Sequence, residues 1–323
     1  MPSPDFLAAG RSGKHDFPRY LVTIALVITA FILGQLPLMG YLRAHGDRLD
    51  PDALAQFDFA AMGFDPNIIL LFMLLPFAVG MAALLAGVRY FHMRPLRTVL
   101  TGRPRLDRSR IAFAAGLWLA ITAALELVAI AWDPGNYTVT FAPLPFVLLL
   151  AVGLLFLPIQ TTFEEVMMRG YLFQGIARLA PWRWIPVVIT SLLFGLLHGL
   201  NPEIGEFGAA LMMPYYIGVG VVLAVTVLMD EGLELAIGYH AANNLYGAIL
   251  VNYEGSPLNT PSLLTIADVD AAAMLVSWLV SAVIFLYFCA RRYGWRNWTA
   301  RLAGPVDRGD SPSDTQQPGG SHD

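Results

Sequence analysis

The sequence predicts an all-α membrane protein: a polytopic bundle of about eight transmembrane helices with an active site inside the membrane. Three observations predict it. Hydrophobic residues make up 56% of the 323 residues and charged residues only 14%, too little charge for the surface of a soluble domain. Apolar runs of about 20 residues, the length that crosses a bilayer, recur along the chain. A glutamate pair, an arginine and two histidines nevertheless fall within such runs, where a charge usually has a partner and a function.

Eight apolar segments can be drawn, and together they favour one helix bundle over two soluble domains. The first segment is too long for the core of a signal peptide and no cleavage pattern of small residues follows it, so we expect it to be retained. The predicted segments cover residues 20–42, 68–89, 110–132, 144–164, 184–200, 209–229, 234–252 and 271–290.

These segments suggest a division of the chain into five parts. The three N-terminal helices are expected to form a scaffold, the next four segments carry the charged motifs, and a tail rich in Pro, Gly, Ser and Asp is expected to be disordered. The parts are an N-terminal tail (1–19), the scaffold (20–143), the motif-bearing core (144–252), the last transmembrane helix with its flanks (253–302) and the C-terminal tail (303–323).

The basic residues predict the orientation in the membrane. With eight spans, 18 of the 20 Lys and Arg residues fall on one side, in the two tails and in the connections after the second and fourth segments. Only Arg43 and Arg48 fall on the other side. The positive-inside rule therefore predicts a multi-pass protein of the cell membrane with both termini in the cytoplasm.

Several functional classes are disfavoured by what the sequence lacks. It has no basic patch interleaved with aromatic residues, so we expect no nucleic-acid partner. Cys289 is the only cysteine, which excludes an intramolecular disulfide and a cysteine-rich metal site; we expect it to fill apolar space. The Gly-x-Ser-x-Gly and His-Glu-x-x-His motifs are also missing.

The first charged motif is Glu164-Glu165-Val-Met-Met-Arg169. On a helix, Glu165 and Arg169 share a face, whereas adjacent residues are rotated by about 100°. We therefore expect Glu165 to pair with Arg169, and Glu164 to face a cavity as a general base or acid. The alternative is that the segment ends here and the three charged side chains are solvated at the membrane interface.

The other two motifs supply imidazoles and amides. Phe194 and His198 are four residues apart, as are His240 and Asn244, so each pair lies along one helix face. Asn243 points elsewhere, as a supporting or helix-packing residue. Counting from the predicted helix ends places His198 about 20 Å deep but His240 only about 10 Å deep. A kinked fourth segment or an interfacial helix across 165–183 would bring them level.

Two hydrolytic chemistries fit these residues. In the first, Glu164, His198 and His240 hold zinc or another divalent metal with an open position for water. In the second, Glu164 and His198 activate water without a metal, and His240 with Asn244 stabilises the oxyanion. Either route hydrolyses an amide, and neither uses a covalent nucleophile.

The ordered motifs Glu-Glu-x-x-x-Arg, Phe-x-x-x-His and His-x-x-x-Asn resemble those of the CPBP family of intramembrane proteases. That family includes the type 2 CAAX prenyl endopeptidases and the bacteriocin-processing or immunity (Abi) proteins. The resemblance covers about residues 145–250 and includes Gly170 after the arginine. It implies a protease-like catalytic core across 144–252 and a glutamate-dependent or metallo-endopeptidase activity. The residues it assigns to the site are Glu164, Glu165, Arg169, His198, His240 and Asn244.

In this resemblance Glu164 is the catalytic glutamate, supported by Glu165 and Arg169. His198 helps to activate water, and His240 with Asn244 binds the oxyanion. The implied substrate is a membrane-embedded or lipid-anchored protein or peptide, with CAAX-type prenylated proteins as one class. Two alternatives remain from the sequence: a non-catalytic immunity or scaffold protein of the same fold, and an ion-coupled transporter.

Two further groups of charges stand outside the motifs. Glu126 lies in the middle of the third segment, where it is expected to pair with a polar group of the bundle, to line the substrate cavity or to belong to a proton path. Asp230, Glu231 and Glu234 lie at a turn between two helices and are expected to face water.

Overall fold

The computed structural model describes residues 5–307, apart from 56–57, 254–255, 257 and 259. Residues 308–323 of the predicted disordered tail thus lie outside the described residues. The α-helices are α1 (Phe6–Ala9), α2 (Phe17–Gly34), α3 (Leu36–Ala44), α4 (Pro51–Ala55), α5 (Pro66–Ala86), α6 (Arg108–Trp132), α7 (Pro143–Glu165), α8 (Phe173–Leu179), α9 (Trp184–Leu197), α10 (Pro202–Phe207), α11 (Ala209–Asp230), α12 (Glu234–Leu245), α13 (Ala271–Tyr293) and α14 (Trp298–Ala303).

Shorter elements join these helices. Two turns of 3₁₀-helix, η1 (Gly46–Arg48) and η4 (Pro134–Asn136), lie in connections, and a third, η3 (Leu96–Val99), lies between α5 and α6. Three π-helical segments continue α5, α7 and α12. They are η2 (Gly87–Phe91), η5 (Val166–Leu172) and η6 (Tyr246–Leu250).

The predicted class, an all-α polytopic membrane protein, is confirmed. Among the described residues, six helical stretches are long and apolar enough to cross a membrane. All eight predicted segments contain helix, although α9 is a shorter apolar helix of 14 residues. The remaining regular structure is a small sheet of β1 (Tyr137–Val139), β2 (Val251–Tyr253) and β3 (Leu264–Ile266). β3 lies in the middle, antiparallel to β1 and parallel to β2.

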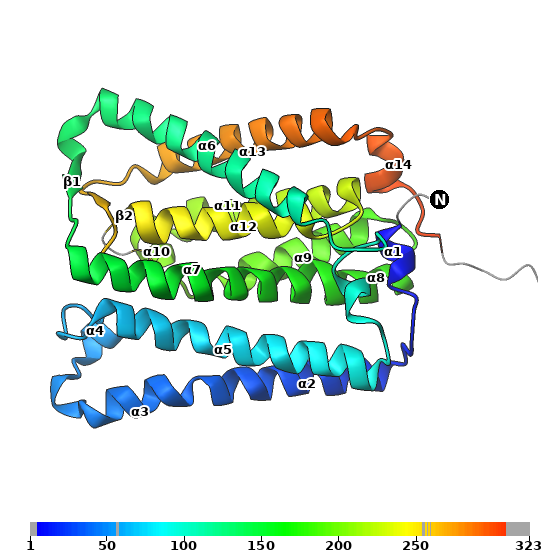
Figure 1. The fold of residues 1–323 in the computed structure, drawn as a ribbon, viewed down its shortest axis with the longest axis horizontal. Coiled ribbons are helices and arrows are strands. Elements are labelled where there is room, and N and C mark those ends of the chain that lie inside the picture. Colours follow the sequence, from blue (N-terminus) through cyan, green and yellow to red (C-terminus); the bar gives the residue numbers. More distant parts are fainter. Residues whose placement is uncertain (1–4, 56–57, 254–255, 257, 259, 308–323) are drawn as a thin grey trace, which may run out of the picture.

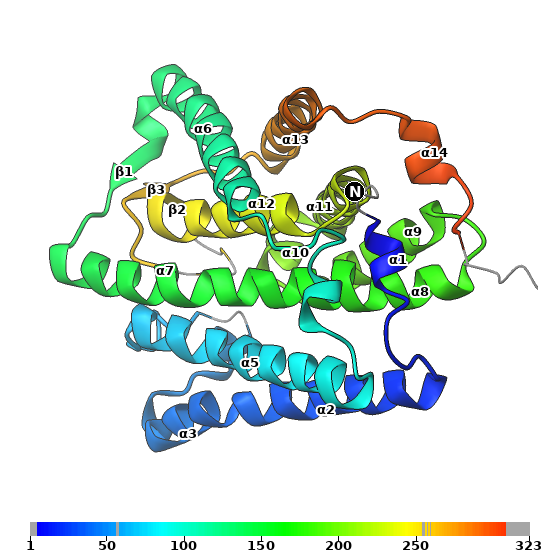
Figure 2. The same ribbon diagram turned by 45° about the vertical axis from the view of Figure 1, so that its right-hand side comes forward.

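The helices form a layered bundle (Figure 1). α2 packs on α5, and α5 packs on α7. α12 packs on both α7 and α6, while α11 packs on α9, α12 and α13. The turned view in Figure 2 places α6 and α13 across α11 and α12 from α7. The interior position of α12 agrees with its burial, because every residue from Glu234 to Ala242 is buried.

The fourth predicted segment is far longer than expected. α7, η5 and α8 form one uninterrupted helical stretch of 37 residues, Pro143–Leu179. At about 1.5 Å per residue it is about 55 Å long, whereas the hydrocarbon core of a bilayer is about 30 Å thick. The segment is therefore neither broken after Glu165 nor followed by a separate interfacial helix. α9 folds back along it as the second arm of a hairpin.

The two described chain ends lie at the same end of the bundle, here called the terminal end (Figure 1). Arg11 and Asp307 form an ion pair there, 3.3 Å between Nη2 and Oδ2. The opposite end carries the small sheet. Residues 5–16, predicted as part of a cytoplasmic tail, pack into the fold, since Phe6 is fully buried.

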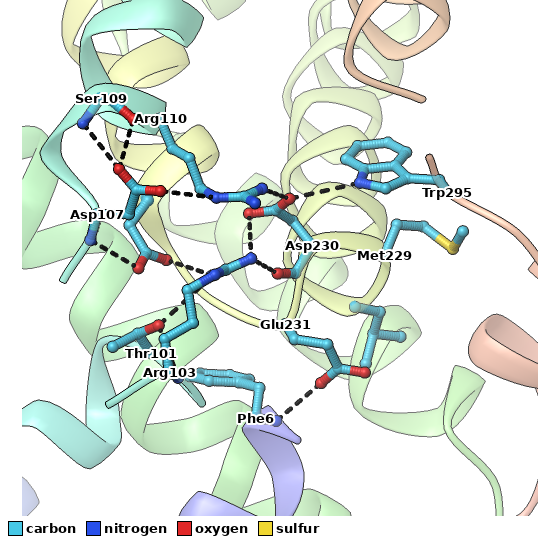
Figure 3. Close-up of polar contacts among 12 residues, drawn as sticks. Phe6, Thr101, Arg103, Asp107, Ser109, Arg110, Met229, Asp230, Glu231 and Trp295 are labelled. Carbon is cyan, nitrogen blue, oxygen red and sulfur yellow. Dashed lines mark hydrogen bonds and ion pairs between the residues drawn. The ribbon is translucent and has the colours of Figure 1, made fainter. Parts of the chain in front are cut away.

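The prediction that Asp230, Glu231 and Glu234 face water was wrong. All three are buried at the terminal end, within a network of arginines (Figure 3). Arg103 reaches Asp230 at 3.0 Å and Glu234 at 3.1 Å, and Arg110 also pairs with Asp230. Arg103 lies in the connection between α5 and α6, and Arg110 lies in the first turn of α6. Together they cover the turn between α11 and α12, which looks exposed in the sequence.

Glu231 connects three distant parts of the chain, and Figure 3 shows its contact with Phe6. Its carboxylate accepts the backbone N–H of Phe6 at 2.7 Å and a hydrogen bond from Arg301 in α14 at 2.9 Å. Its carbonyl oxygen accepts the N–H of Gly102 at 3.0 Å. The residue caps α11 in a left-handed conformation, φ 57°, which is uncommon for a non-glycine residue and is held here by these bonds.

Candidate active site

The predicted ion pair between Glu165 and Arg169 is present. Arg169 Nη1 lies 3.0 Å from Glu165 Oε1, and both side chains are completely buried. Arg169 also donates from Nη2 to the carbonyl oxygen of Gly220 in α11 at 3.3 Å, and its guanidinium lies 4.4 Å from the centre of the Phe194 ring. The alternative in which these charges are solvated at the interface is therefore wrong for this pair.

The hairpin of α8 and α9 explains how His198 and His240 reach the same depth along the bundle axis. Leu179 lies 14 residues beyond Glu165, and His198 lies 14 residues beyond Trp184, where the return arm begins. Because the arms are equally long, His198 returns to the level of the glutamates, and Phe194 to that of Arg169. The apparent difference in depth arose because α9 starts farther out along the bundle axis than α12.

His240 lies between the two adjacent glutamates. Its Nδ1 is 2.7 Å from Glu165 Oε1, and its Nε2 is 3.6 Å from Glu164 Oε2. We expected neighbouring glutamates on a helix to serve different points. They do contact different atoms, but both atoms belong to the same imidazole ring. A carboxylate accepts hydrogen bonds only, so Nδ1 is the donor to Glu165 and carries a proton.

A continuous series of hydrogen bonds joins α6, α12 and α7 at Glu164. Trp118 Nε1 donates to Asn243 at 3.2 Å, and Asn243 Nδ2 donates to Asn244 at 3.3 Å. Asn244 Nδ2 donates to Gln160 Oε1 at 3.1 Å, and Gln160 Nε2 donates to Glu164 Oε1 at 2.6 Å. Asn243 thus supports Asn244, as predicted for a residue pointing away from the centre.

Gln160 is the member of this series that the sequence analysis missed. It lies one helical turn before Glu164, so the spacing of four residues was the available signal. The carboxylate of Glu164 therefore has an amide donor on one oxygen, while the other oxygen is buried and has no hydrogen-bond partner among the described residues. That oxygen lies 3.6 Å from Nε2 of His240.

His198 lies beside this centre without a direct bond to it. Its Nδ1 is 2.8 Å from the carbonyl oxygen of Phe194, which can only accept, so Nδ1 carries the proton and Nε2 is free to accept one. Among the described residues, no hydrogen bond joins His198 to Glu164 or His240. The Phe194 ring is the common neighbour, 4.4 Å from the His198 ring and 5.9 Å from the His240 ring.

The described side chains do not converge as a metal site. No group of three His, Cys, Asp or Glu residues among them is arranged to hold a metal ion. In His240 and His198 the Nδ1 atoms are engaged by Glu165 and Phe194, so Nε2 of each ring is the nitrogen that could bind a metal ion. Zinc binding remains a prediction that only a metal assay can test.

Glu126 pairs with polar groups of the bundle, the first of the three predicted roles. Tyr137 and Tyr246 both donate their hydroxyls to it, at 2.6 and 2.9 Å. The two tyrosines come from β1 and η6, so Glu126 joins α6 to the small sheet and to the end of the helix that carries His240. This position suits a structural contact away from the charged centre.

Fold and site together define a polytopic membrane protein with a carboxylate–imidazole centre buried in its helix bundle. Residues 143–246, from the start of α7 to the end of α12, match the family model described as Rce1-like, type II CAAX prenyl endopeptidase. This segment is therefore similar to the type II CAAX prenyl endopeptidases of the Rce1-like family. The predicted resemblance is confirmed at this level.

One curated relative extends the similarity beyond that segment. The uncharacterized protein YyaK of Bacillus subtilis (strain 168) is 27% identical over 256 residues, which cover 79% of this chain and 85% of that protein. No solved structure matches the chain.

Proposed function

We propose that this protein is an intramembrane endopeptidase that hydrolyses a peptide bond of a membrane-associated protein or peptide. The observation that carries the proposal is the position of His240 between Glu164 and the Glu165–Arg169 pair. The match of residues 143–246 to the Rce1-like family model supports the same class of reaction.

In the proposed mechanism Glu164 is the general base. Its free oxygen takes a proton from a water molecule, whose oxygen attacks the carbonyl carbon of the peptide bond. The C–N bond of the tetrahedral intermediate then breaks as Glu164 returns the proton to the leaving amine, which gives a new carboxylate and a new amine. His198, with Nε2 free to accept, assists in removing the proton from water.

His240 and Asn244 are the proposed oxyanion donors. Asn244 uses one amide hydrogen on Gln160 and has a second for the oxyanion. Nδ1 of His240 donates its proton to Glu165, so Nε2 can also donate only when the ring is the doubly protonated imidazolium. In that form the positive charges of His240 and Arg169 balance the negative charges of Glu164 and Glu165. Charge balance matters here, because an unpaired buried charge is costly in apolar surroundings.

The proposed substrate is embedded in the membrane or anchored to it by a lipid, with CAAX-type prenylated proteins as the first class to test. We propose that the terminal end of the bundle faces the cytoplasm, because most basic residues fall in the tails, connections and helix ends there, whereas only Arg43 and Arg48 fall at the other end. A divalent metal at Glu164, His198 and His240 is the alternative to the metal-free route.

The test is cleavage of a fluorogenic prenylated CAAX peptide by the protein purified in detergent, with and without a chelator. Glu164→Gln should lower the rate by a factor of about 10² to 10⁴, the usual contribution of a general base. Glu206→Gln makes the same chemical change at an exposed site and should leave the rate unchanged. Loss of activity with chelator would favour the metal route.

Two outcomes would contradict the proposal. A Glu164→Gln variant that cleaves at the wild-type rate would remove the glutamate from the reaction. Wild-type protein that cleaves neither the prenylated peptide nor the same peptide without its lipid would argue against a CAAX-type substrate.

A further inference from the structure

His198 is held by a second group of residues that lies outside the three motifs. It follows the last residue of α9 and precedes the turn into α10, so no helix continues past it to fix its ring. The ring instead stacks on Tyr216 of α11, with 4.5 Å between ring centres and 28° between the ring planes. Tyr216 is itself buried.

Two side chains from the segment just after His198 hold the hydroxyl of Tyr216. The hydroxyl donates to Glu203 Oε1 and accepts a hydrogen bond of 2.8 Å from Asn201 Nδ2. Both bonds cross from the start of α10 to α11. The tyrosine is therefore fixed at its tip by hydrogen bonds, while its ring face supports the imidazole.

Burial of Glu203 is unfavourable for the stability of the fold. Its side chain is 3% exposed, and its Oε2 is buried without a hydrogen-bond partner among the described residues. Burial raises the pKa of this carboxyl to about 7. A buried carboxyl with one oxygen unsatisfied costs free energy of folding. An apolar side chain of similar size would avoid that cost, so the carboxyl must serve something other than packing.

We infer that Glu203 and Tyr216 are positioning residues for His198: the carboxyl fixes the tyrosine, and the tyrosine ring fixes the imidazole at the charged centre. An effect of Glu203 on catalysis rests on the proposed function, in which His198 helps to activate water. The dependence of the imidazole orientation on Glu203 does not require catalysis and can be measured separately.

The kinetic test compares two replacements of Glu203. Glu203→Leu removes the acceptor for Tyr216 and should lower kcat at least about tenfold with little change in KM, because a misplaced catalytic group slows the chemical step. Glu203→Gln keeps an oxygen acceptor and should rescue most of that loss. Glu206→Leu, an exposed glutamate on the same helix, is the matched control and should have the wild-type kcat.

Stability separates positioning from packing. Glu203→Leu removes a buried, partly unsatisfied carboxyl but leaves the Tyr216 hydroxyl without its acceptor. The two effects oppose each other, so the unfolding temperature should change little. A fall in kcat that parallels a fall in unfolding temperature would overturn the inference, as would a Glu203→Leu variant with the wild-type kcat.

Nitrogen NMR of ring-¹⁵N-labelled histidine tests the orientation without any substrate. The chain has only six histidines, and the signals of His198 are assigned from their loss in His198→Gln. In the wild type they should be those of a neutral ring protonated at Nδ1. Glu203→Leu and Tyr216→Leu should shift or broaden them, and Glu203→Gln should not.

Unchanged His198 signals in both leucine variants would overturn the inference whatever the kinetics. If the wild type cleaves neither test peptide, the CAAX-type substrate is contradicted, whereas these spectra still decide whether Glu203 and Tyr216 set the orientation of the imidazole.

Discussion

Glu165 and Arg169 form a buried pair with no contact with solvent, and each leaves one polar atom without a partner among the described residues. Such a pair adds little net stability, but removing one member leaves an uncompensated charge in an apolar interior. Its value lies in fixing the rotation of the helix that carries Glu164 and in holding His240 through Glu165.

Arg169→Met should therefore destabilise the protein by about 3–5 kcal/mol. Thermal or denaturant unfolding in detergent measures the change, and the double variant Glu165→Gln/Arg169→Met should recover part of it. Arg19→Met removes a partner from an exposed pair with Asp16 and should cost less than about 1 kcal/mol. Equal effects of Arg169→Met and Arg19→Met would contradict the assignment of a buried charge pair.

Gln160→Leu tests the hydrogen-bond series at Glu164. The substitution removes the donor to Glu164 and the acceptor for Asn244, so both groups lose their orientation. We expect peptide cleavage to fall about 10²-fold, the scale of a misplaced catalytic group, while the helical circular dichroism spectrum stays unchanged. Wild-type cleavage by this variant would show that Gln160 only fills space.

The sequence identifies residues better than it identifies their partners. Helical spacing was enough to predict the Glu165–Arg169 pair, because both residues lie on one helix. Glu203 and Tyr216 were missed because their partners come from another helix or across a loop. Gln160 was missed although its spacing of four residues from Glu164 on the same helix was visible. Burial of the acidic residues at the turn after α11 was missed for the same reason: arginines more than a hundred residues away cover them.

At the scale of elements, the packing of η5 against the connection after α5 depends on one glycine. A Cβ atom at Gly170 would lie 2.5 Å from the carbonyl oxygen of Val99, closer than packed atoms approach. Because that neighbour is backbone, it cannot turn aside. The helix that carries the glutamates therefore sits against the terminal-end connection with no space between them.

Gly170→Ala should destabilise the protein by about 1–3 kcal/mol through overpacking. Gly116→Ala is the matched control, since Gly116 lies within α6 and its Cβ would meet open space; alanine there should be neutral or slightly stabilising. The unfolding midpoints of the two variants should thus move in different directions or by clearly different amounts. A Gly170→Ala variant as stable as the wild type would contradict the packing argument.

Hydropathy located every long helix but not the length of the fourth one. The apolar run stops where Glu164, Glu165 and Arg169 begin, so the predicted segment ended there. The helix continues because those charged side chains have polar partners inside the bundle and the residues of η5 around them are mostly buried. A charged residue interrupts the hydrophobic pattern in the sequence both when the helix ends there and when it continues. Only the tertiary packing around the charge decides which of the two occurs.

At the scale of the whole molecule, the N-terminal segment is part of the fold. His15 lies where this segment meets α2, with ring contacts to Tyr20 and His92. Burial, together with the charges of Arg178 and Arg94, lowers the pKa of His15 to about 4. Its neutral form is therefore favoured in the folded protein.

This shift predicts a pH-dependent stability with a definite sign. His15 in the unfolded chain binds a proton below its ordinary pKa of 6.5, whereas His15 in the folded protein binds one only near pH 4. The folded protein therefore loses stability as the pH drops from about 6.5 to about 4. His15→Gln should flatten that slope, measured as unfolding temperature against pH in detergent. Identical slopes for wild type and variant would contradict the burial of this histidine.

The global architecture was the most predictable level. Composition and apolar run length are enough for a polytopic helix bundle, since both follow from the thickness and dielectric constant of a bilayer. Which helices lie inside was not evident, because α11 and α12 are no more apolar in sequence than the outer helices. Their interior position follows from packing on both sides.

The equal arms of the hairpin formed by α8 and α9 limit how the sequence of this segment can change in evolution. One residue inserted in a single arm would shift the returning histidine by about 1.5 Å and turn it by about 100° relative to the glutamates. An insertion in the turn at 180–183, or matched insertions in both arms, would leave the alignment intact. Length differences among homologues should therefore gather in that turn, and the spacing within each arm should be inherited unchanged.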